Sequence, residues 1–170
     1  FVFDEAHLLF ADASEAFLHE IGVLSRSTPR RFMNWDELRL LAQNPLATIG
    51  AHTVHHYNLK RLGERSALCE MTESAAIIAA ETGMRPRHFA YPYGYARAVG
   101  AREVDLAMRA GFASAVTTRH GVLLESHRRH PHALPRLSVN GNYQRLSYMH
   151  AMLSGVSTPL ANSGRRLVTV

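Results

Sequence analysis

Short apolar or β-branched runs alternate along the sequence with amphipathic segments, and this alternation constrains the fold more than any other feature. The runs predict strands, the amphipathic segments predict helices, and Gly83 and Gly111 stand where a left-handed residue closes a helix. The predicted strands are 46–51, 88–91 and 112–117, and the predicted helices between them are 64–82 and 102–110. Such alternation favours parallel strands with helices packed outside, in an open sheet or a closed barrel.

Further elements are expected on both sides of this region. Helical spacing of apolar residues predicts a helix at 10–21, and an Asn34-x-x-Glu37 capping box predicts a short helix through Ala42. A strand is predicted at 134–139 and a helix at 145–153. No internal repeat, low-complexity tract or change of composition marks a linker, so we expect residues 1–170 to form a single domain.

Composition excludes several classes of protein. With 170 residues, of which 46% are hydrophobic, the chain can bury a sizeable core, which excludes a disordered protein. The longest apolar stretches, such as 75–80, fall far short of the roughly 20 residues that cross a bilayer, so no membrane span is expected. The single cysteine, Cys69, cannot form an internal disulfide and is expected to be buried in its helix.

The N-terminus and the charge of the chain give only weak information about its compartment and partners. The sequence begins at Phe1 without a signal-peptide pattern, so we expect the true N-terminus to be missing and leave the compartment undetermined, with the cytoplasm favoured. The net charge is +5, but the densest basic cluster, around Arg128 and Arg129, lacks the interleaved aromatic residues of a nucleic-acid groove. We therefore expect no nucleic-acid partner and a solvated loop at 128–132; the oligomeric state is not predicted.

Two histidines follow the first predicted strand of the alternating region. His52 and His56 are four residues apart, so a helical turn after the strand would bring both imidazoles to one face, where they could share a metal ion. His55 would then point away from that face. Histidines at this spacing often have a purely structural role, but ligands in parallel α/β folds gather at the carboxyl ends of strands.

A second candidate segment follows the next predicted strand. In Phe89-Ala90-Tyr91-Pro92-Tyr93-Gly94, proline and glycine predict a tight, exposed turn. Such a turn can direct a backbone N–H towards a developing oxyanion, and its aromatic rings can line a sugar site. The alternative is a core strand that runs into an ordinary turn.

Together these segments resemble a known enzyme family. The chain from about residue 33 onwards is similar to the polysaccharide deacetylases of carbohydrate esterase family 4, which include chitooligosaccharide deacetylase. The similarity lies in four segments, in the same order and spacing: 49–56, 89–94, Gly111-Phe112 leading to 115–118, and Leu134-Pro135-Arg136.

The resemblance implies a distorted (β/α) barrel, here partial and lacking its first strand or strands, and a metal-dependent hydrolase that removes N-acetyl or O-acyl groups from amino-sugar oligosaccharides or polysaccharides. It implies that His52 and His56 bind a divalent metal, with zinc expected and cobalt, nickel or manganese as alternatives. It also implies that Thr53 supports the loop between them, and that the Tyr93 backbone N–H is the oxyanion donor. The predicted substrate-binding residues are Tyr91, Pro92, Tyr93 and Arg136.

The chain also departs from the family pattern. The Thr-Phe-Asp-Asp-Gly motif, which supplies the general base and a metal-binding aspartate, is absent; Phe3-Asp4-Glu5-Ala6 is the nearest string and would make Asp4 the base and Glu5 a ligand. Residues 1–32 instead resemble a helical insertion found in some members, which would put the general base upstream of Phe1 and leave this fragment inactive. Ala90 replaces a frequent arginine, and Arg136 replaces the general-acid histidine. Arg136 itself, His132 or a histidine of the preceding loop could take over that role, and the sequence does not rank them.

These departures leave alternatives to the deacetylase interpretation. One is a non-catalytic carbohydrate-binding or degenerate deacetylase-like module, which would bind oligosaccharides without turnover. Another is a basic nucleic-acid-binding domain, which rests on charge alone.

Overall fold

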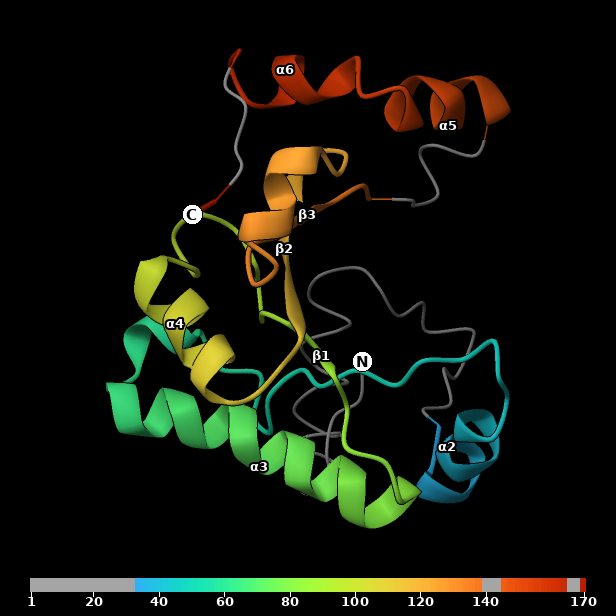
Figure 1. Cartoon of the computed structure of the whole chain (residues 1–170), viewed down its shortest axis with the longest axis vertical. Helices are drawn as coiled ribbons and strands as arrows, with labels where there is room; N and C mark the ends of the chain where they lie inside the picture. The colour runs from blue at the N-terminus through green and yellow to red at the C-terminus, as the bar shows by residue number, and fades with distance from the viewer. Residues whose placement is uncertain (1–32, 139–144, 165–168) are drawn as a thin grey trace, which may run out of the picture.

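The computed structural model describes residues 33–138, 145–164 and 169–170 (Figure 1). Its helices and strands alternate along the described chain as the sequence predicts. The elements are, in order, α2 (Trp35–Ala42), η2 (Leu59–Arg61), α3 (Glu64–Thr82), β1 (His88–Ala90), α4 (Ala101–Arg109), β2 (Ser114–His120), η3 (Glu125–Arg129), β3 (Leu134–Arg136), α5 (Leu146–Leu153) and α6 (Ser157–Ala161). The predicted helix at 10–21 lies outside the described residues.

The three strands form one parallel sheet in the order β1-β2-β3. Ala90 of β1 pairs with Val116 of β2, and Val116 pairs with Leu134 of β3. On the other side of β1, Ala51 forms a single parallel bridge with Phe89: its N–H donates to His88 O, and its C=O accepts from Ala90 N–H, each at 2.9 Å. The parallel arrangement confirms the α/β prediction, whereas three described strands do not by themselves establish a barrel.

The predicted strand at 46–51 is wrong except at Ala51. Asn44 begins a turn that extends into this run, because its side chain accepts the Leu46 N–H and its backbone C=O accepts the Ala47 N–H, each at 2.9 Å. The Leu46 side chain is 94% exposed, so the apolar run is not a buried strand. The turn at Asn44 and Pro45 thus overrides the β propensity of the residues that follow.

The helix predictions agree with the structure more closely. Asn34 and Glu37 form the predicted capping box, since the Asn34 side chain accepts the Glu37 N–H and the Glu37 carboxylate accepts the Asn34 N–H, each at 2.9 Å. The predicted bounds of α3 are those observed, and Gly83 closes it in a left-handed conformation at φ 74°. Cys69 is exposed, contrary to prediction, because it lies on the solvent side of α3.

One apolar core joins α2, α3, α4 and the sheet. The Phe89 ring stacks on Phe112 with ring centroids 5.0 Å apart and meets the edge of Tyr91 at 5.2 Å. From α3, Met71 and Ala75 are fully buried in the same core. Burying each large side chain contributes about 1.5–3 kcal/mol, so this packing stabilises the position of β1 against α3.

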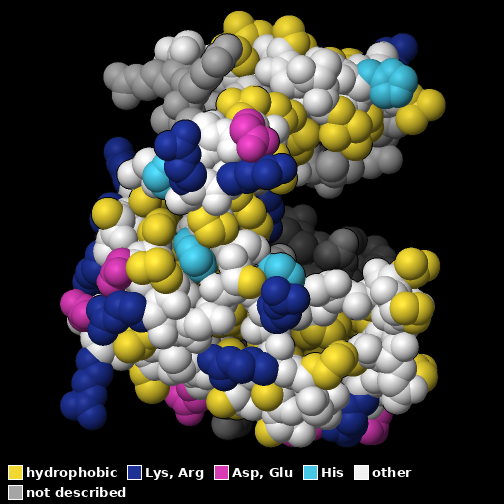
Figure 2. All heavy atoms as spheres, in the orientation of Figure 1, with side chains coloured by type: hydrophobic (Ala, Val, Ile, Leu, Met, Phe, Trp, Pro, Cys, Tyr) yellow, Lys and Arg dark blue, Asp and Glu magenta, His cyan; other side chains and the backbone are white. Residues whose placement is uncertain are grey.

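The C-terminal helices lie apart from this core (Figure 1). They are attached to the end of β2 through His120, whose Nε2 lies 2.9 Å from Ser157 Oγ and whose backbone C=O accepts from Asn162 Nδ2 at 2.8 Å. Figure 2 shows hydrophobic side chains at the surface of these helices, where Leu146 and Leu160 are strongly exposed. Among the described helices, none has the length and apolar character needed to cross a bilayer.

A buried carboxylate fixes the start of α4. Glu103 is fully buried; it accepts the Gly100 N–H at 2.9 Å and the Arg102 guanidinium at 2.7 Å. Arg102 in turn donates to the backbone C=O groups of Leu62 and Leu59, at 3.0 and 2.8 Å. The network therefore connects α4 with the turn that precedes α3.

We expect Glu103→Ala to lower the free energy of unfolding by about 3 kcal/mol, because it leaves a guanidinium and a backbone N–H without their buried partner. The measurement is the midpoint of urea unfolding followed by circular dichroism. Asp105→Ala on the exposed side of the same helix is the matched control and should leave the midpoint nearly unchanged. Equal midpoints for both variants would contradict this account of Glu103.

Candidate active site

His52 is positioned by the backbone at the end of β1. It follows Ala51, the residue that bridges to Phe89, and its Nδ1 lies 2.7 Å from Ala90 O. Because a carbonyl oxygen only accepts, Nδ1 carries the proton, and the lone pair is on Nε2. Burial lowers the pKa of His52 to about 4, opposed by the bond to Ala90 and assisted by the nearby charges of His56 and Arg136. The imidazole is therefore neutral near pH 7.

His56 meets His52 through a left-handed loop. The two ring centroids are 4.8 Å apart, with an interplanar angle of 66°. The rings converge as expected, but the predicted helical turn is wrong: Thr53 and His56 have φ values of 68° and 54°. Fully buried Thr53 supports this loop, because its Oγ1 accepts the His56 N–H at 3.0 Å.

His55, between the two, points elsewhere. Its Nδ1 lies 2.6 Å from the Glu70 carboxylate, and its ring stacks on Tyr57 with centroids 5.3 Å apart. This orientation agrees with the prediction that His55 faces away from the histidine pair.

The turn after β1 brings Tyr93 next to the His52–His56 pair. The Tyr93 ring centroid is 5.0 Å from that of His56, and the side chain is 41% exposed. Tyr93 and Gly94 both have φ 63°, and Thr118 of β2 holds them by donating its Oγ1–H to Tyr93 O at 2.8 Å and its N–H to Gly94 O at 2.9 Å. Within the described chain, no group accepts the Tyr93 N–H.

The other residues of this turn require a correction to the sequence prediction. Tyr91 is 1% exposed; its hydroxyl donates to His132 O at 2.8 Å, and its pKa is raised, first by burial and then by the charge of Glu103. Pro92 is also fully buried. Because both side chains are covered by protein, they support the turn from within and do not present a surface to a sugar.

Arg136 and His132 lie in different environments. Arg136 is exposed at the end of β3, its Nε donates to Thr117 O at 2.9 Å, and its charge acts on His52. His132 instead directs its Nε2 to Phe112 O at 2.7 Å. Of these two candidates, the structure brings Arg136 towards the histidine pair and engages the His132 ring with the backbone.

Glu70 is a site residue that sequence analysis missed. Its carboxylate lies on the buried face of α3 and accepts hydrogen bonds from the loop between His52 and His56. A signal was present in the sequence, because Glu70 falls on the same helical face as Met71 and Ala75, where a charged residue needs a buried partner.

The histidine pair fits part of a metal site. Two imidazoles with ring centroids 4.8 Å apart, of which His52 is neutral and has its Nδ1 fixed by a backbone carbonyl, are suitable nitrogen ligands for a divalent metal. In the part of the chain that the structure describes, no group of three or more His, Cys, Asp or Glu side chains could hold a metal. Asp4 and Glu5 lie outside that part, so a carboxylate ligand is not assigned.

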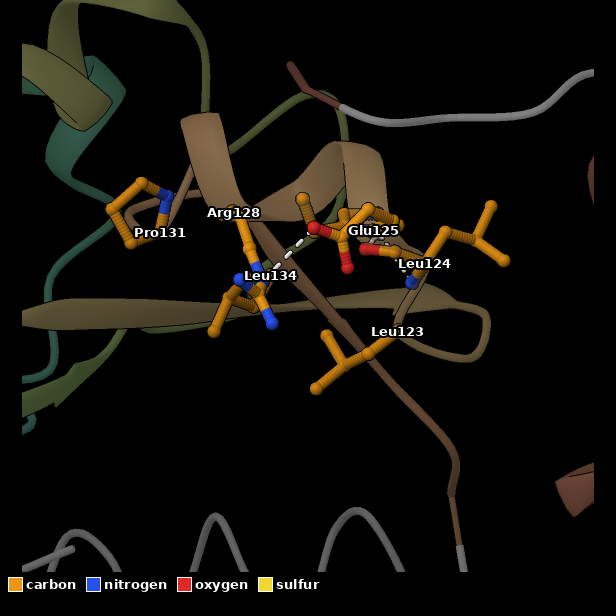
Figure 3. A pocket seen from close by; sticks show the side chains of 7 residues that line it. Leu123, Leu124, Glu125, Arg128, Pro131 and Leu134 are labelled. Atoms are coloured by element: carbon orange, nitrogen blue, oxygen red, sulfur yellow. Dashed lines mark hydrogen bonds and ion pairs between the residues drawn. The ribbon is translucent and has the colours of Figure 1, made fainter.

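A separate hollow of about 440 Å³ lies beside η3 (Figure 3). It is lined mainly by apolar side chains, including Leu123, Leu124 and Leu134, while Arg128 and Glu125 form an ion pair at 3.1 Å along it. Neither histidine of the pair contributes to this hollow, so it is distinct from the candidate site.

Three solved structures share the fold. PplD, a deacetylase from Streptococcus pyogenes, matches with a TM-score of 0.62 and 19% identity over 79% of this chain and 54% of its own. IcaB from Ammonifex degensii matches with a TM-score of 0.55 and 20% identity over 71% of this chain and 52% of its own. BC0361, a polysaccharide deacetylase from Bacillus cereus, matches with a TM-score of 0.62 and 14% identity over 84% of this chain and 47% of its own. The chain thus spans about half the length of these structures.

The sequence itself identifies the family. No curated protein matches it significantly. The family model for polysaccharide deacetylase matches residues 12–113. Because this match covers more than half of the chain, the chain belongs to the polysaccharide deacetylase family.

Proposed function

We propose that this chain carries part of the active site of a hydrolase that removes N-acetyl or O-acyl groups from amino-sugar oligosaccharides or polysaccharides. The observation that carries the proposal is the convergence of His52, His56 and Tyr93 at the end of β1, in a chain of this family. PplD and BC0361, with the same fold, are named as deacetylases.

In this proposal, His52 and His56 hold a divalent metal, with zinc expected and cobalt, nickel or manganese as alternatives. When bound, the metal would polarise the acyl carbonyl and activate water for attack. His52 is prepared for this role because the Ala90 carbonyl fixes its tautomer and burial keeps it neutral.

Tyr93 and Arg136 would act on the substrate. The Tyr93 N–H, which has no acceptor in the described chain, would donate to the negative charge that develops on the acyl oxygen. The exposed Tyr93 ring and the Arg136 guanidinium would contact the sugar, while Tyr91 and Pro92 hold the turn from beneath.

The proposal also needs groups outside the described residues. A general base and a carboxylate ligand would come from Asp4 and Glu5 or from sequence beyond Phe1. We further propose that the three-stranded sheet and Ala51 belong to a distorted (β/α) barrel within one domain, with residues 1–32 as a helical insertion.

A second candidate is a module that binds acetylated oligosaccharides without turnover, as expected if the chain alone is inactive. It is favoured by Arg136, which stands where the family has its general-acid histidine. Oligosaccharide binding without acetate release, with or without added zinc, would support the module over the enzyme.

We expect His52→Ala and His56→Ala each to weaken binding of Zn²⁺ or Co²⁺ by at least about tenfold, because each removes a nitrogen ligand. Binding is measured by calorimetric titration of the metal-free chain. His130→Ala, at an exposed histidine, is the matched control and should bind as the unaltered chain does. Unchanged affinity in both site variants would contradict the proposed metal ligands.

We expect Gly94→Ala to lower kcat for acetate release by about 100-fold or more, the effect of losing one oxyanion donor. An alanine Cβ would lie 2.6 Å from Thr118 N, so the turn that presents the Tyr93 N–H would have to move. The assay uses the protein with its general base present, including any sequence that precedes Phe1, and measures acetate released from short N-acetylglucosamine oligomers, with and without a chelator.

Gly63→Ala is the control for that variant, because a Cβ there meets no atom within 4 Å. It should leave acetate release unchanged. Full activity in Gly94→Ala would exclude the Tyr93 turn as the oxyanion donor.

A further inference from the structure

We propose that Glu70 is a positioning residue for the candidate metal site: from α3, its carboxylate sets the shape of the loop that carries His52 and His56. This inference rests on the proposed function, because it assigns a role in metal binding to a residue that contacts the histidine loop and is not one of the proposed ligands.

The Glu70 carboxylate receives three hydrogen bonds from two consecutive loop residues. Its Oε2 accepts the Val54 N–H at 3.1 Å and the His55 N–H at 2.9 Å, and its Oε1 lies 2.6 Å from His55 Nδ1. The side chain is 10% exposed, so these bonds replace most of its hydration. Bonds to an ionised, buried carboxylate are stronger than bonds between neutral groups.

The loop needs such support because of its backbone conformation. Thr53 and His56, on either side of the bonded pair, both have positive φ, which costs a non-glycine residue roughly 1–2 kcal/mol each. Without Glu70, the N–H of Val54 would lose its acceptor while the Val54 side chain stays buried. The loop would then relax towards other conformations, and the His56 ring would no longer be held beside His52.

Glu70 can fix the loop because its own position is fixed. Its helix is anchored by Met71 and Ala75, which are fully buried in the core. Glu73, one turn along the same helix, is exposed, and the Cys69 thiol donates to it at 3.6 Å. Comparing the same substitution at Glu70 and at Glu73 therefore separates the effect of losing the loop contact from the effect of changing any glutamate in α3.

The test compares Co²⁺ affinity and amide exchange in three variants of the full chain. Glu70→Met keeps the length of the side chain but removes both acceptor oxygens. Glu70→Gln keeps one oxygen for the Val54 and His55 N–H groups and places an amide beside His55 Nδ1. Glu73→Met makes the same change at the exposed position. Thermal unfolding of each variant establishes that it is folded.

We expect Glu70→Met to bind Co²⁺ at least about tenfold more weakly, as loss of groups that orient metal ligands usually does, and Glu70→Gln to recover most of that loss. Glu73→Met should bind as the unaltered chain does. Folded Glu70→Met with unaltered affinity would overturn the inference, as would an equal loss in Glu73→Met.

Hydrogen exchange in the metal-free chain separates this inference from the proposed function. If Glu70 holds the loop, exchange of the Val54 and His55 amides becomes faster in Glu70→Met, while core amides of α3 keep their rates. Unchanged exchange at Val54 and His55 would overturn the inference. Failure of the unaltered chain to bind Co²⁺ would refute the proposed metal site instead, whatever the exchange rates are.

Discussion

The backbone of Ala90 connects the sheet to the candidate active site. Its N–H donates to Ala51 O, which joins the incoming segment to β1, and its C=O accepts from His52 Nδ1. Both bonds come from one residue at the end of a short strand, so the strand backbone holds His52 directly. That core includes Phe89, whose ring packs against Phe112 and Tyr91. Small, buried Ala90 thus acts through its backbone alone.

Around Ala90, the site consists of two loops, and both contain left-handed residues held by contacts from another element. The histidine loop has left-handed Thr53 and His56, and the turn after β1 has left-handed Tyr93. Each is held by side chains of another element: Glu70 of α3 for the first, and Thr118 of β2 for the second. Non-glycine residues keep such conformations only where surrounding contacts fix them, and such positions are enriched at functional sites. The helices and the sheet therefore determine the shape of the loops that carry the candidate functional groups.

The sequence predicted the parts of the structure that depend on local patterns. The capping box at Asn34, the bounds of α3 and the left-handed Gly83 follow from residue types at fixed spacing, and all are confirmed. The error at 46–51 arose because a turn at Asn44 outweighed the apolar pattern that follows it. The exposure of Cys69 could not be read from α3 alone, since it depends on which face the rest of the fold covers.

At the site, too, local patterns predicted some features, while others depend on contacts with the rest of the fold. Sequence spacing indicated that His52 and His56 come together, but not the left-handed loop that achieves it, because that conformation depends on Glu70, which is distant in sequence. The burial of Tyr91 was missed for the same reason: its hydroxyl bonds to His132 O, a contact between residues 41 positions apart. Local patterns identified candidate side chains, whereas contacts between distant residues decide which of them face a ligand.

Charge places a further condition on the chemistry proposed for this site. His52 is neutral, and the Arg136 guanidinium lowers its pKa further, which also opposes a cation bound beside it. Carboxylate ligands, in addition to the two imidazoles, would offset this charge and strengthen the binding of a divalent metal held there. A guanidinium stays protonated in proteins, so Arg136 can stabilise a developing negative charge but cannot donate a proton to a leaving amine. In the proposed deacetylation, that proton would have to come from another group, and Arg136 would contribute to substrate binding and charge stabilisation.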